Sequence, residues 1–207
     1  MRPVSRRNIS SFPGLLRIEV IRLFVALPVE GDRAALEEVH AQLVQWDAVL
    51  KNVPPENYHI TLKFFGNCDD HLGNRIREAF SSLSMETGSI PFALEGLGTF
   101  PGGRRARVVW CGLRTETAAI NRICRTVDRF ATRLGFKEEK RDFVPHLTLA
   151  RVRKGRELTG DIVHFIEQNR NTVFGKASFN RLVLFSSQLT PQGPRYTELA
   201  EMLFSNS

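Results

Sequence analysis

The sequence predicts an α+β protein made of two similar halves. Two observations lead to this expectation. Strand-like and helix-like apolar periodicities alternate along the chain. One four-residue word also occurs twice, as His-Ile-Thr-Leu at residues 59–62 and as His-Leu-Thr-Leu at residues 146–149. Because the two words lie close to half a chain apart, an internal duplication is the simplest account of them.

The first half is predicted to fold in the order strand, helix, strand, helix, strand. Its first segment is apolar and β-branched and is ended by Pro28, whereas the helical segments place apolar residues three and four positions apart. Gly96 and Gly98 weaken the third strand. The expected strands cover residues 17–27, 58–65 and 92–100, and the expected helices cover residues 32–46 and 69–85.

The second half repeats this order after the Pro-Gly-Gly turn at residues 101–103. Its first helix has the most regular apolar stripe in the chain, and Gly135 supplies a stop signal. We expect helices at residues 117–134 and 159–168, and strands at residues 106–113, 145–152, near 174–185 and near 196–204.

Residues 1–16 are expected to lie outside the folded part. They contain three arginines, three serines and no acidic residue, a composition that also fits a transit peptide, but Pro3 and Pro13 interrupt any amphipathic helix. We therefore expect a disordered extension at 1–16. Residues 17–207 are expected to form a single domain of two lobes, with the duplicated halves at about 17–100 and 104–207.

Composition excludes several classes of protein. Of the 207 residues, 42% are hydrophobic and 25% are charged, which is typical of a soluble globular chain. No apolar run approaches the roughly 20 residues of a membrane helix. Three cysteines without a Cys-x-x-Cys pair disfavour a disulfide framework and a structural zinc site, so we expect a reducing, cytoplasmic setting. The net charge of +7 fits either a polyanionic partner or a solvated basic surface.

The repeated word places a histidine and a threonine on one face of each strand, because side chains in a strand alternate between faces. On the first strand this alternation also places Lys63 beside His59 and Thr61, with Tyr58, Ile60, Leu62 and Phe64 on the core side. On the second strand His146 and Thr148 share a face. Alternation places Arg151 on the opposite side unless a bulge or a strand end intervenes.

Two histidines on the open faces of duplicated strands suit concerted acid–base catalysis. Imidazole titrates near neutral pH, so one ring can accept a proton while the other donates one. The nearby threonine hydroxyls can donate hydrogen bonds to phosphoryl oxygens, so a sugar–phosphate diester fits as the substrate. A zinc site is disfavoured, because His40, His71 and His164 fall on predicted helices without ligand spacing.

The chain resembles the two-histidine phosphoesterase superfamily, and within it the LigT-like RNA 2′,3′-cyclic phosphodiesterases. The likeness extends over nearly the whole chain from about Arg22. It is carried by residues 22–27 (RLFVAL), 55–66 (PENYHITLKFFG), 96–101 (GLGTFP), Arg104 to Trp110, residues 145–151 (PHLTLAR), and Ser187, Gln188, Leu189, Gly193 and Tyr196. Val144 departs from the family pattern, which often has a basic residue at that position.

The resemblance implies two similar α+β lobes, each a mainly antiparallel sheet with helices on its outer face, around a catalytic cleft. It also implies hydrolysis of RNA 2′,3′-cyclic phosphate ends to 2′-phosphomonoesters without a metal or other cofactor. In that reaction His59 would be the proton donor and His146 the proton acceptor. Thr61 and Thr148 would bind the phosphate oxygens.

Four basic residues are possible further substrate contacts. Arg151 and Lys63 lie close to the repeated words, and Arg104 and Arg107 lie beside the turn between the halves. For each of them a solvated or ion-paired surface role is the alternative interpretation.

Three other functions remain open at this point: an RNA 2′–5′ ligase, an RNA-end binding module, and a phosphodiesterase of small cyclic nucleotide metabolites. The expected partners are RNA ends or nucleotides that carry a 2′,3′-cyclic phosphate. We expect no membrane association and a monomer.

Overall fold

The computed structural model describes residues 21–31, 34–139, 143–190 and 193–205. The expected extension at 1–16 and the start of the first predicted strand lie outside these residues. The elements in chain order are β1 (Ile21–Pro28), α1 (Ala34–Val44), β2 (Leu50–Asn52), the short 3-10 turn η1 (Pro55–Asn57), β3 (His59–Cys68), α2 (Asp70–Ser81), β4 (Ile90–Phe100), β5 (Val108–Thr115), α3 (Thr117–Arg133), β6 (His146–Val152), α4 (Gly160–Gln168), β7 (Val173–Phe179), β8 (Arg181–Thr190) and β9 (Gly193–Leu203). The four predicted helices are present, and the α+β class is confirmed.

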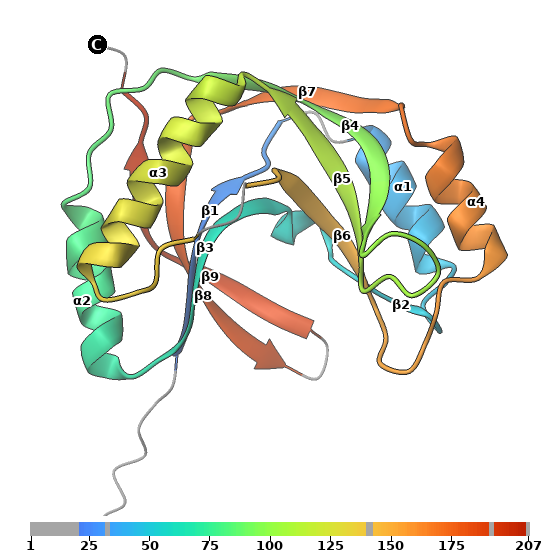
Figure 1. The fold of residues 1–207 in the computed structure, drawn as a ribbon, viewed down its shortest axis with the longest axis horizontal. Coiled ribbons are helices and arrows are strands. Elements are labelled where there is room, and N and C mark those ends of the chain that lie inside the picture. The colour runs from blue at the N-terminus through green and yellow to red at the C-terminus, as the bar shows by residue number, and fades with distance from the viewer. Residues whose placement is uncertain (1–20, 32–33, 140–142, 191–192, 206–207) are drawn as a thin grey trace, which may run out of the picture.

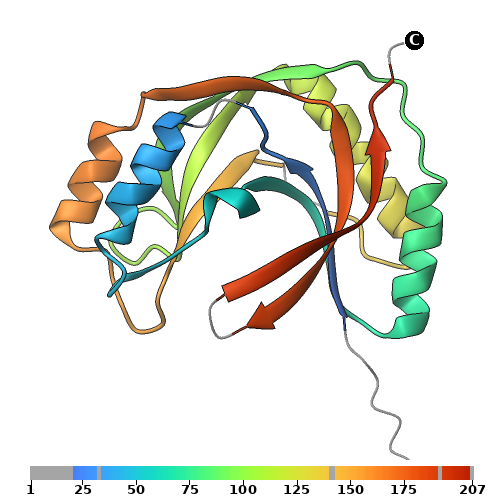
Figure 2. The same cartoon turned by 180° about the vertical axis from the view of Figure 1, so that it is seen from behind.

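Two antiparallel sheets make up the two lobes. The four-stranded sheet has the order β3-β1-β8-β9 and the five-stranded sheet has the order β2-β6-β5-β4-β7. Figures 1 and 2 show the sheets facing one another, with α2 and α3 outside the four-stranded sheet and α1 and α4 outside the five-stranded sheet. The four α-helices of the described residues thus lie on the outer faces of the two sheets.

Each sheet combines strands from both halves of the sequence. β4 belongs to the first half of the chain but pairs with β5 and β7 of the second half, and β8 pairs with β1. The helices cross over as well, because α1 follows β1 but packs on β2 and β7, and α3 follows β5 but packs on β3. The halves at 17–100 and 104–207 thus do not correspond to the two sheets.

Alternating burial along β1 explains how the four-stranded sheet is held in place. Leu23, Val25 and Leu27 are fully buried in the main core, which the helices cover. The residues between them, Phe24 and Ala26, are also buried, but they pack with Val183 and Phe185 in a separate small cluster on the other face. A strand that is buried on both faces needs apolar residues at every position, as the sequence of β1 provides.

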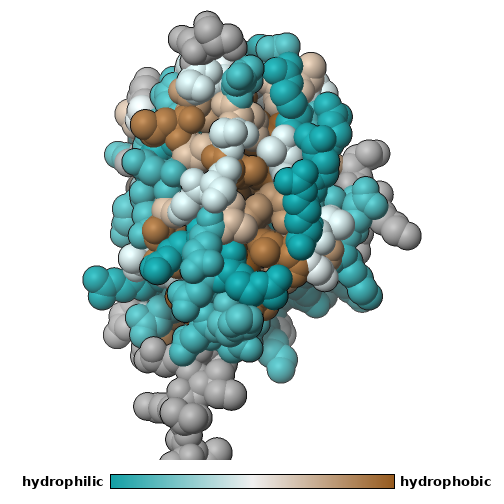
Figure 3. All heavy atoms as spheres, turned by 90° about the vertical axis from the view of Figure 1, so that its left-hand side faces the viewer, coloured by the Kyte–Doolittle hydropathy of each residue, from teal (hydrophilic) through white to brown (hydrophobic). Residues whose placement is uncertain are grey.

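The helix-covered side of this lobe presents a polar surface to solvent. Helix α3 buries Ile120, Ile123, Val127 and Phe130 along one stripe, and its remaining positions are mostly polar. Figure 3 views this side and shows hydrophilic side chains around a narrower apolar strip. No helix within the described residues is both long enough and apolar enough to cross a membrane.

Two predictions about strands are wrong. The strand expected near residues 174–185 is two strands, β7 and β8, which meet at Asn180 and belong to different sheets. β2 was not predicted, because three residues are too few to show a period-2 pattern. The division into β7 and β8 could not be predicted, because the pairing partner of a strand is set by distant residues.

Candidate active site

The two repeated words lie at the start of strands that meet across the cleft. His59 is the first residue of β3, at the edge of the four-stranded sheet, and His146 is the first residue of β6 in the five-stranded sheet. β3 and β6 contact each other although they belong to different sheets. The fold therefore brings two segments that are distant in the sequence to one place.

Each of the two strands has a β-bulge directly after its threonine. Thr61 pairs with Ala26 and Lys63 with Val25, so Leu62 has no partner in the ladder. In the same way Thr148 pairs with Trp110 and Ala150 with Val109, which leaves Leu149 without a partner. Because an extra residue reverses the alternation of side chains, the residues beyond each bulge change face.

The first bulge overturns the predicted placement of Lys63 and Phe64. Lys63 turns away from His59 and binds α3, with its Nζ 2.5 Å from Asp128 Oδ1 and 3.0 Å from the carbonyl oxygen of Lys137. Phe64, which was expected in the core, is 57% exposed and lines the cavity beside Thr61. Lys63 is therefore not among the residues that line the cavity.

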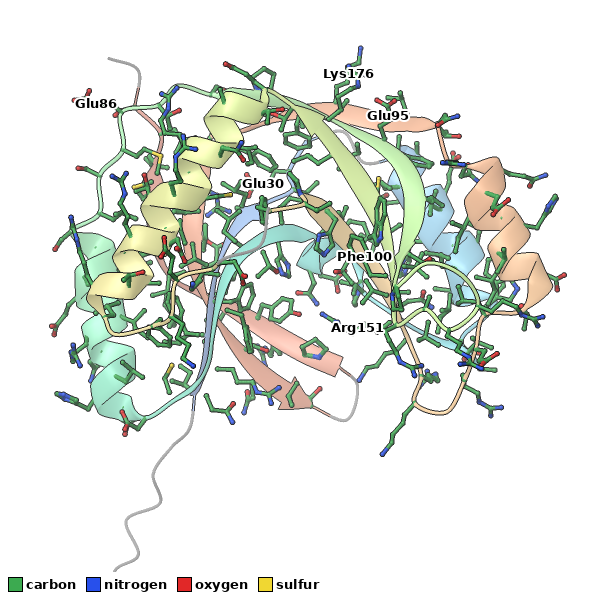
Figure 4. The ribbon with its side chains drawn as sticks, viewed as in Figure 1. Glu30, Glu86, Glu95, Phe100, Arg151 and Lys176 are labelled. Carbon is green, nitrogen blue, oxygen red and sulfur yellow. The ribbon has the colours of Figure 1, made fainter. Side chains whose placement is uncertain are left out.

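The second bulge resolves the expected conflict over Arg151. Beyond Leu149 the alternation changes, and Arg151 lines the same cavity as Thr148. Arg151 lies five residues after His146, as Phe64 lies five residues after His59. Figure 4 shows Arg151 where β6 borders the space between the sheets.

The cavity between the sheets has a volume of about 330 Å³. It brings together the predicted residues His59, Thr61, Thr148 and Arg151. His146 is not among the lining residues, but it is two residues before Thr148 on the same strand. The other lining residues are Arg22 and Phe24 from β1, residues 51–54, Phe64 from β3, and Ser187, Leu189, Pro194 and Tyr196 from β8 and β9.

Both histidine rings make the same contact with the backbone. The Nδ1 of His59 is 2.7 Å from the carbonyl oxygen of Asn57, and the Nδ1 of His146 is 2.8 Å from that of Val144. A carbonyl oxygen can only accept, so Nδ1 carries the hydrogen in each ring. Each Nε2 is then the nitrogen left for proton transfer.

Aromatic rings enclose His59. Its ring centroid lies 4.9 Å from that of Phe24 and 5.3 Å from that of Tyr196, with Phe185 slightly further away. Burial among these rings lowers the pKa of His59 below 6.5, the hydrogen bond to Asn57 opposes this change, and the positive charge of Arg151 adds to it. The surroundings thus favour the neutral form of His59.

His146 has a different neighbour. Its ring meets Phe100 edge to face, with centroids 5.1 Å apart, and Phe100 in turn lies against Trp110. Gly98 permits this arrangement, because a Cβ at that position would lie only 2.2 Å from Cζ2 of Trp110. Figure 4 places Phe100 near β6 on the side of the cleft that carries Arg151.

Two predicted contacts do not reach the cavity. Arg104 and Arg107 lie in the connection between β4 and β5 and are not among the lining residues, and the Nε of Arg104 donates to the carbonyl oxygen of Leu158 at 3.4 Å. Arg22 and Lys51 do line the cavity. Sequence reasoning did not identify these two as site residues, because their place depends on strand pairing that no local pattern reveals.

No metal site is apparent in the described part of the chain, where no group of three or more His, Cys, Asp or Glu side chains is arranged to hold an ion. The residues that line the cavity offer hydroxyl, imidazole and cationic groups. Such groups suit an anionic ligand rather than a cation.

Comparisons with known proteins agree with this arrangement. The family model of LigT like Phosphoesterase matches residues 27–110 and 113–196. A protein of Aeropyrum pernix named RNA 2′,3′-cyclic phosphodiesterase is 37% identical over 158 residues, which cover 76% of this chain and 88% of that protein. A protein of the same name from Archaeoglobus fulgidus is 36% identical over 181 residues, which cover 86% and 98% of the two chains.

Solved structures show the same fold. The protein TT0787 of Thermus thermophilus has a TM-score of 0.66 at 25% identity and covers 89% of this chain and 98% of its own. LigT of E. coli, solved with 3′-AMP, has a TM-score of 0.64 at 22% identity and covers 91% of this chain and 100% of its own. From the match of the family model and from these relatives we conclude that the chain belongs to the LigT like phosphoesterase family.

Proposed function

We propose that this enzyme hydrolyses 2′,3′-cyclic phosphate at RNA ends to a 2′-phosphomonoester, and that His59 and His146 carry the proton transfers without a cofactor. One observation supports this most directly. His59, Thr61, Thr148 and Arg151 come from two strands of different sheets to one cavity, and none of the described residues that line it is acidic. Relatives at 36–37% identity carry the name of this activity.

The proposed reaction needs one proton acceptor and one proton donor. His146 takes a proton from water as the water oxygen attacks phosphorus. The bond from phosphorus to the 3′ oxygen breaks, and His59 gives that oxygen a proton through Nε2. The product carries a 2′-phosphate and a free 3′-hydroxyl, and the two histidines have exchanged protonation states.

Thr61 and Thr148 act on the phosphate itself. Their hydroxyl groups donate hydrogen bonds to the non-bridging oxygens, where negative charge increases as water attacks. Arg151 adds a positive charge beside them.

Replacing either histidine tests this proposal. We expect His59→Ala and His146→Ala each to lower kcat by about 10²–10⁴-fold, the usual contribution of general acid–base catalysis. Hydrolysis of an oligonucleotide with a 2′,3′-cyclic end should be followed by phosphorus NMR, with EDTA added in a parallel sample. The expected product is the 2′-monoester, with and without EDTA.

Three outcomes would contradict the proposal. A 3′-monoester product would reverse the two histidine roles, and retention of most activity in both variants would remove them. Binding of the RNA end with no turnover in the wild-type enzyme would instead indicate a binding module. Unchanged circular dichroism of both variants is the control that they remain folded.

Two features of the setting belong to the same proposal. The enzyme is proposed to act as a monomer, and size-exclusion chromatography with light scattering checks this. It is proposed to act in the reducing cytoplasm, since the chain has only three cysteines and none of them forms a disulfide. Fractionation of cells followed by immunoblotting checks the compartment.

A further inference from the structure

Two cationic side chains lie directly opposite each other at one wall of the cavity. Lys51 in the short edge strand β2 and Arg151 in β6 are Cα partners in an antiparallel pair. Residues directly opposite in such a pair have side chains on the same face, with Cβ atoms about 5 Å apart. Both are exposed and both line the cavity, whereas Leu50 beside Lys51 is buried on the other face.

This pair has no acidic partner among the described residues. Within the described residues, neither Lys51 nor Arg151 takes part in an ion pair. The residues that line the cavity include a third cation, Arg22, but no carboxylate. By contrast, Lys63 binds Asp128, and Arg181 binds Glu30, Glu198 and Glu201. Like charges directly opposite one another destabilise a sheet, and a bound anion would remove that cost.

The pair is offset from the threonines along the same wall of the cavity. With Leu149 bulged out, Arg151 is two ladder positions beyond Thr148, or about 7 Å along the strand. Lys51 is one strand further, about 5 Å to the side. The spacing is close to the length of one nucleotide in an extended strand.

We propose that Lys51 and Arg151 form a second phosphate subsite, which binds the phosphate on the 5′ side of the nucleotide that carries the cyclic phosphate. The inference rests on the function proposed above and extends it to the class of substrate. The enzyme should prefer a nucleotide with a 5′ phosphate, either free or linked to a preceding nucleoside, over a bare nucleoside 2′,3′-cyclic phosphate. Arg151 also faces the threonine site, so Lys51 is the residue that distinguishes the two phosphates.

Three substrates test the subsite: adenosine 2′,3′-cyclic phosphate, the same compound with a 5′-phosphate, and an adenylyl dinucleotide with a 2′,3′-cyclic end. We expect wild-type kcat/KM to be higher for the second and third than for the first. The test quantity is the preference ratio, which is kcat/KM for the second or third substrate divided by kcat/KM for the first. Lys51→Ala should lower this ratio by about tenfold, as expected for loss of one charge-assisted contact. If Lys51→Ala lowers kcat/KM for only the 5′-phosphorylated nucleotide, or for only the dinucleotide, the subsite is still supported. The affected substrate then identifies which kind of phosphate the subsite binds.

Two further variants make the result specific. Lys51→Arg keeps the charge and should keep most of the ratio. Lys176→Ala removes an exposed lysine from β7 of the same sheet, far from Arg151 in Figure 4, and should leave the ratio unchanged. A ratio that Lys51→Ala does not change, or an equal loss of kcat/KM on all three substrates, would overturn the subsite.

A binding measurement separates this inference from the proposed reaction. Calorimetry should compare adenosine 2′-phosphate with adenosine 2′,5′-bisphosphate on the wild-type enzyme and on Lys51→Ala. We expect the bisphosphate to bind the wild type about tenfold more tightly than the monophosphate and to lose this advantage in Lys51→Ala. If no cyclic substrate is turned over, the proposed reaction fails while this binding difference still supports the subsite, and equal wild-type affinities would overturn the subsite even if the reaction proceeds.

Discussion

Phe24, Phe185 and Tyr196 control how His59 titrates. These rings exclude water from the imidazole, and burial is the largest cause of its lowered pKa. A proton donor with a low pKa gives its proton readily, but a smaller fraction of it is protonated at neutral pH. If His59 is the proton donor, as proposed, its enclosure is expected to set part of the pH dependence of the enzyme.

We expect Phe24→Ala to raise the pKa of His59 toward 6.5, because water regains access to the ring. Titration of the imidazole Cε1–H signal by NMR measures this pKa directly. Phe100→Ala is the matched control, since Phe100 contacts His146 and not His59. An unaltered His59 titration in Phe24→Ala would show that the aromatic enclosure is not the cause.

The same pKa shift affects stability. The folded pKa of His59 is below 6.5, so its contribution to the free energy of unfolding is present above pH 6.5. It is lost as the pH falls through the folded pKa, because the unfolded state then binds the proton more readily. We expect the urea midpoint to decrease over that range, and to decrease less in Phe24→Ala.

Phe64 lines the cavity and is 57% exposed, so its aromatic ring is open to a ligand. We expect it to stack on the nucleobase, a contact that is generally worth about 1–3 kcal/mol. Phe64→Ala should then raise KM by about tenfold and change kcat little, as steady-state kinetics can measure. Leu203→Ala removes another exposed apolar side chain outside the cavity and should leave KM unchanged, and an equally unchanged KM in Phe64→Ala would exclude stacking.

At the scale of elements, the packing of β4 against β5 positions His146. Trp110 occupies the space above Gly98, and Phe100 contacts both Trp110 and His146. Gly98→Ala should lower the free energy of unfolding by about 1–3 kcal/mol through overpacking, and should also lower kcat. Gly102→Ala is the matched control, because its added Cβ would meet no atom within 4 Å.

Urea denaturation measures both glycine variants. Gly102→Ala should remain within about 0.5 kcal/mol of the wild type. Equal stability of the two variants would contradict a tight contact between Gly98 and Trp110.

Most elements could be predicted from the sequence, but the faces of their residues could not. The helices and the paired histidine words follow from periodicity and repetition, which are local signals. The bulges at Leu62 and Leu149 have no local signal, because they arise from pairing with β1 and β5. Because of these bulges, the side chains of Phe64 and Arg151 lie on the cavity face of their sheets, whereas Lys63 lies on the opposite face. Lys51 was missed for the same reason, since its partner lies in distant β6.

At the scale of the whole molecule, the interleaving of the two sheets joins the halves into one unit. The four-stranded sheet takes β1 and β3 from the first half and β8 and β9 from the second. The five-stranded sheet is likewise built from both. The repeated word predicts an internal duplication, but repetition carries no information on which half supplies which strand.

Neither half should fold alone. We expect separate chains of residues 1–103 and 104–207 to lack a cooperative thermal transition by circular dichroism, because each would hold incomplete sheets with unpaired edges. The full chain is the control and should unfold in one transition. A cooperative transition in either fragment would contradict the interleaved assembly.

The paired bulges bear on the regiochemistry of ring opening. A site with two equivalent histidines would accept the cyclic ester in either sense and release either oxygen. The bulges present an aromatic ring on one strand and a guanidinium on the other at matching offsets. We expect a nucleotide to place its base against Phe64 and its negative charge against Arg151, which allows one orientation only. The two bulges would then make a nearly symmetric site selective for a single isomer.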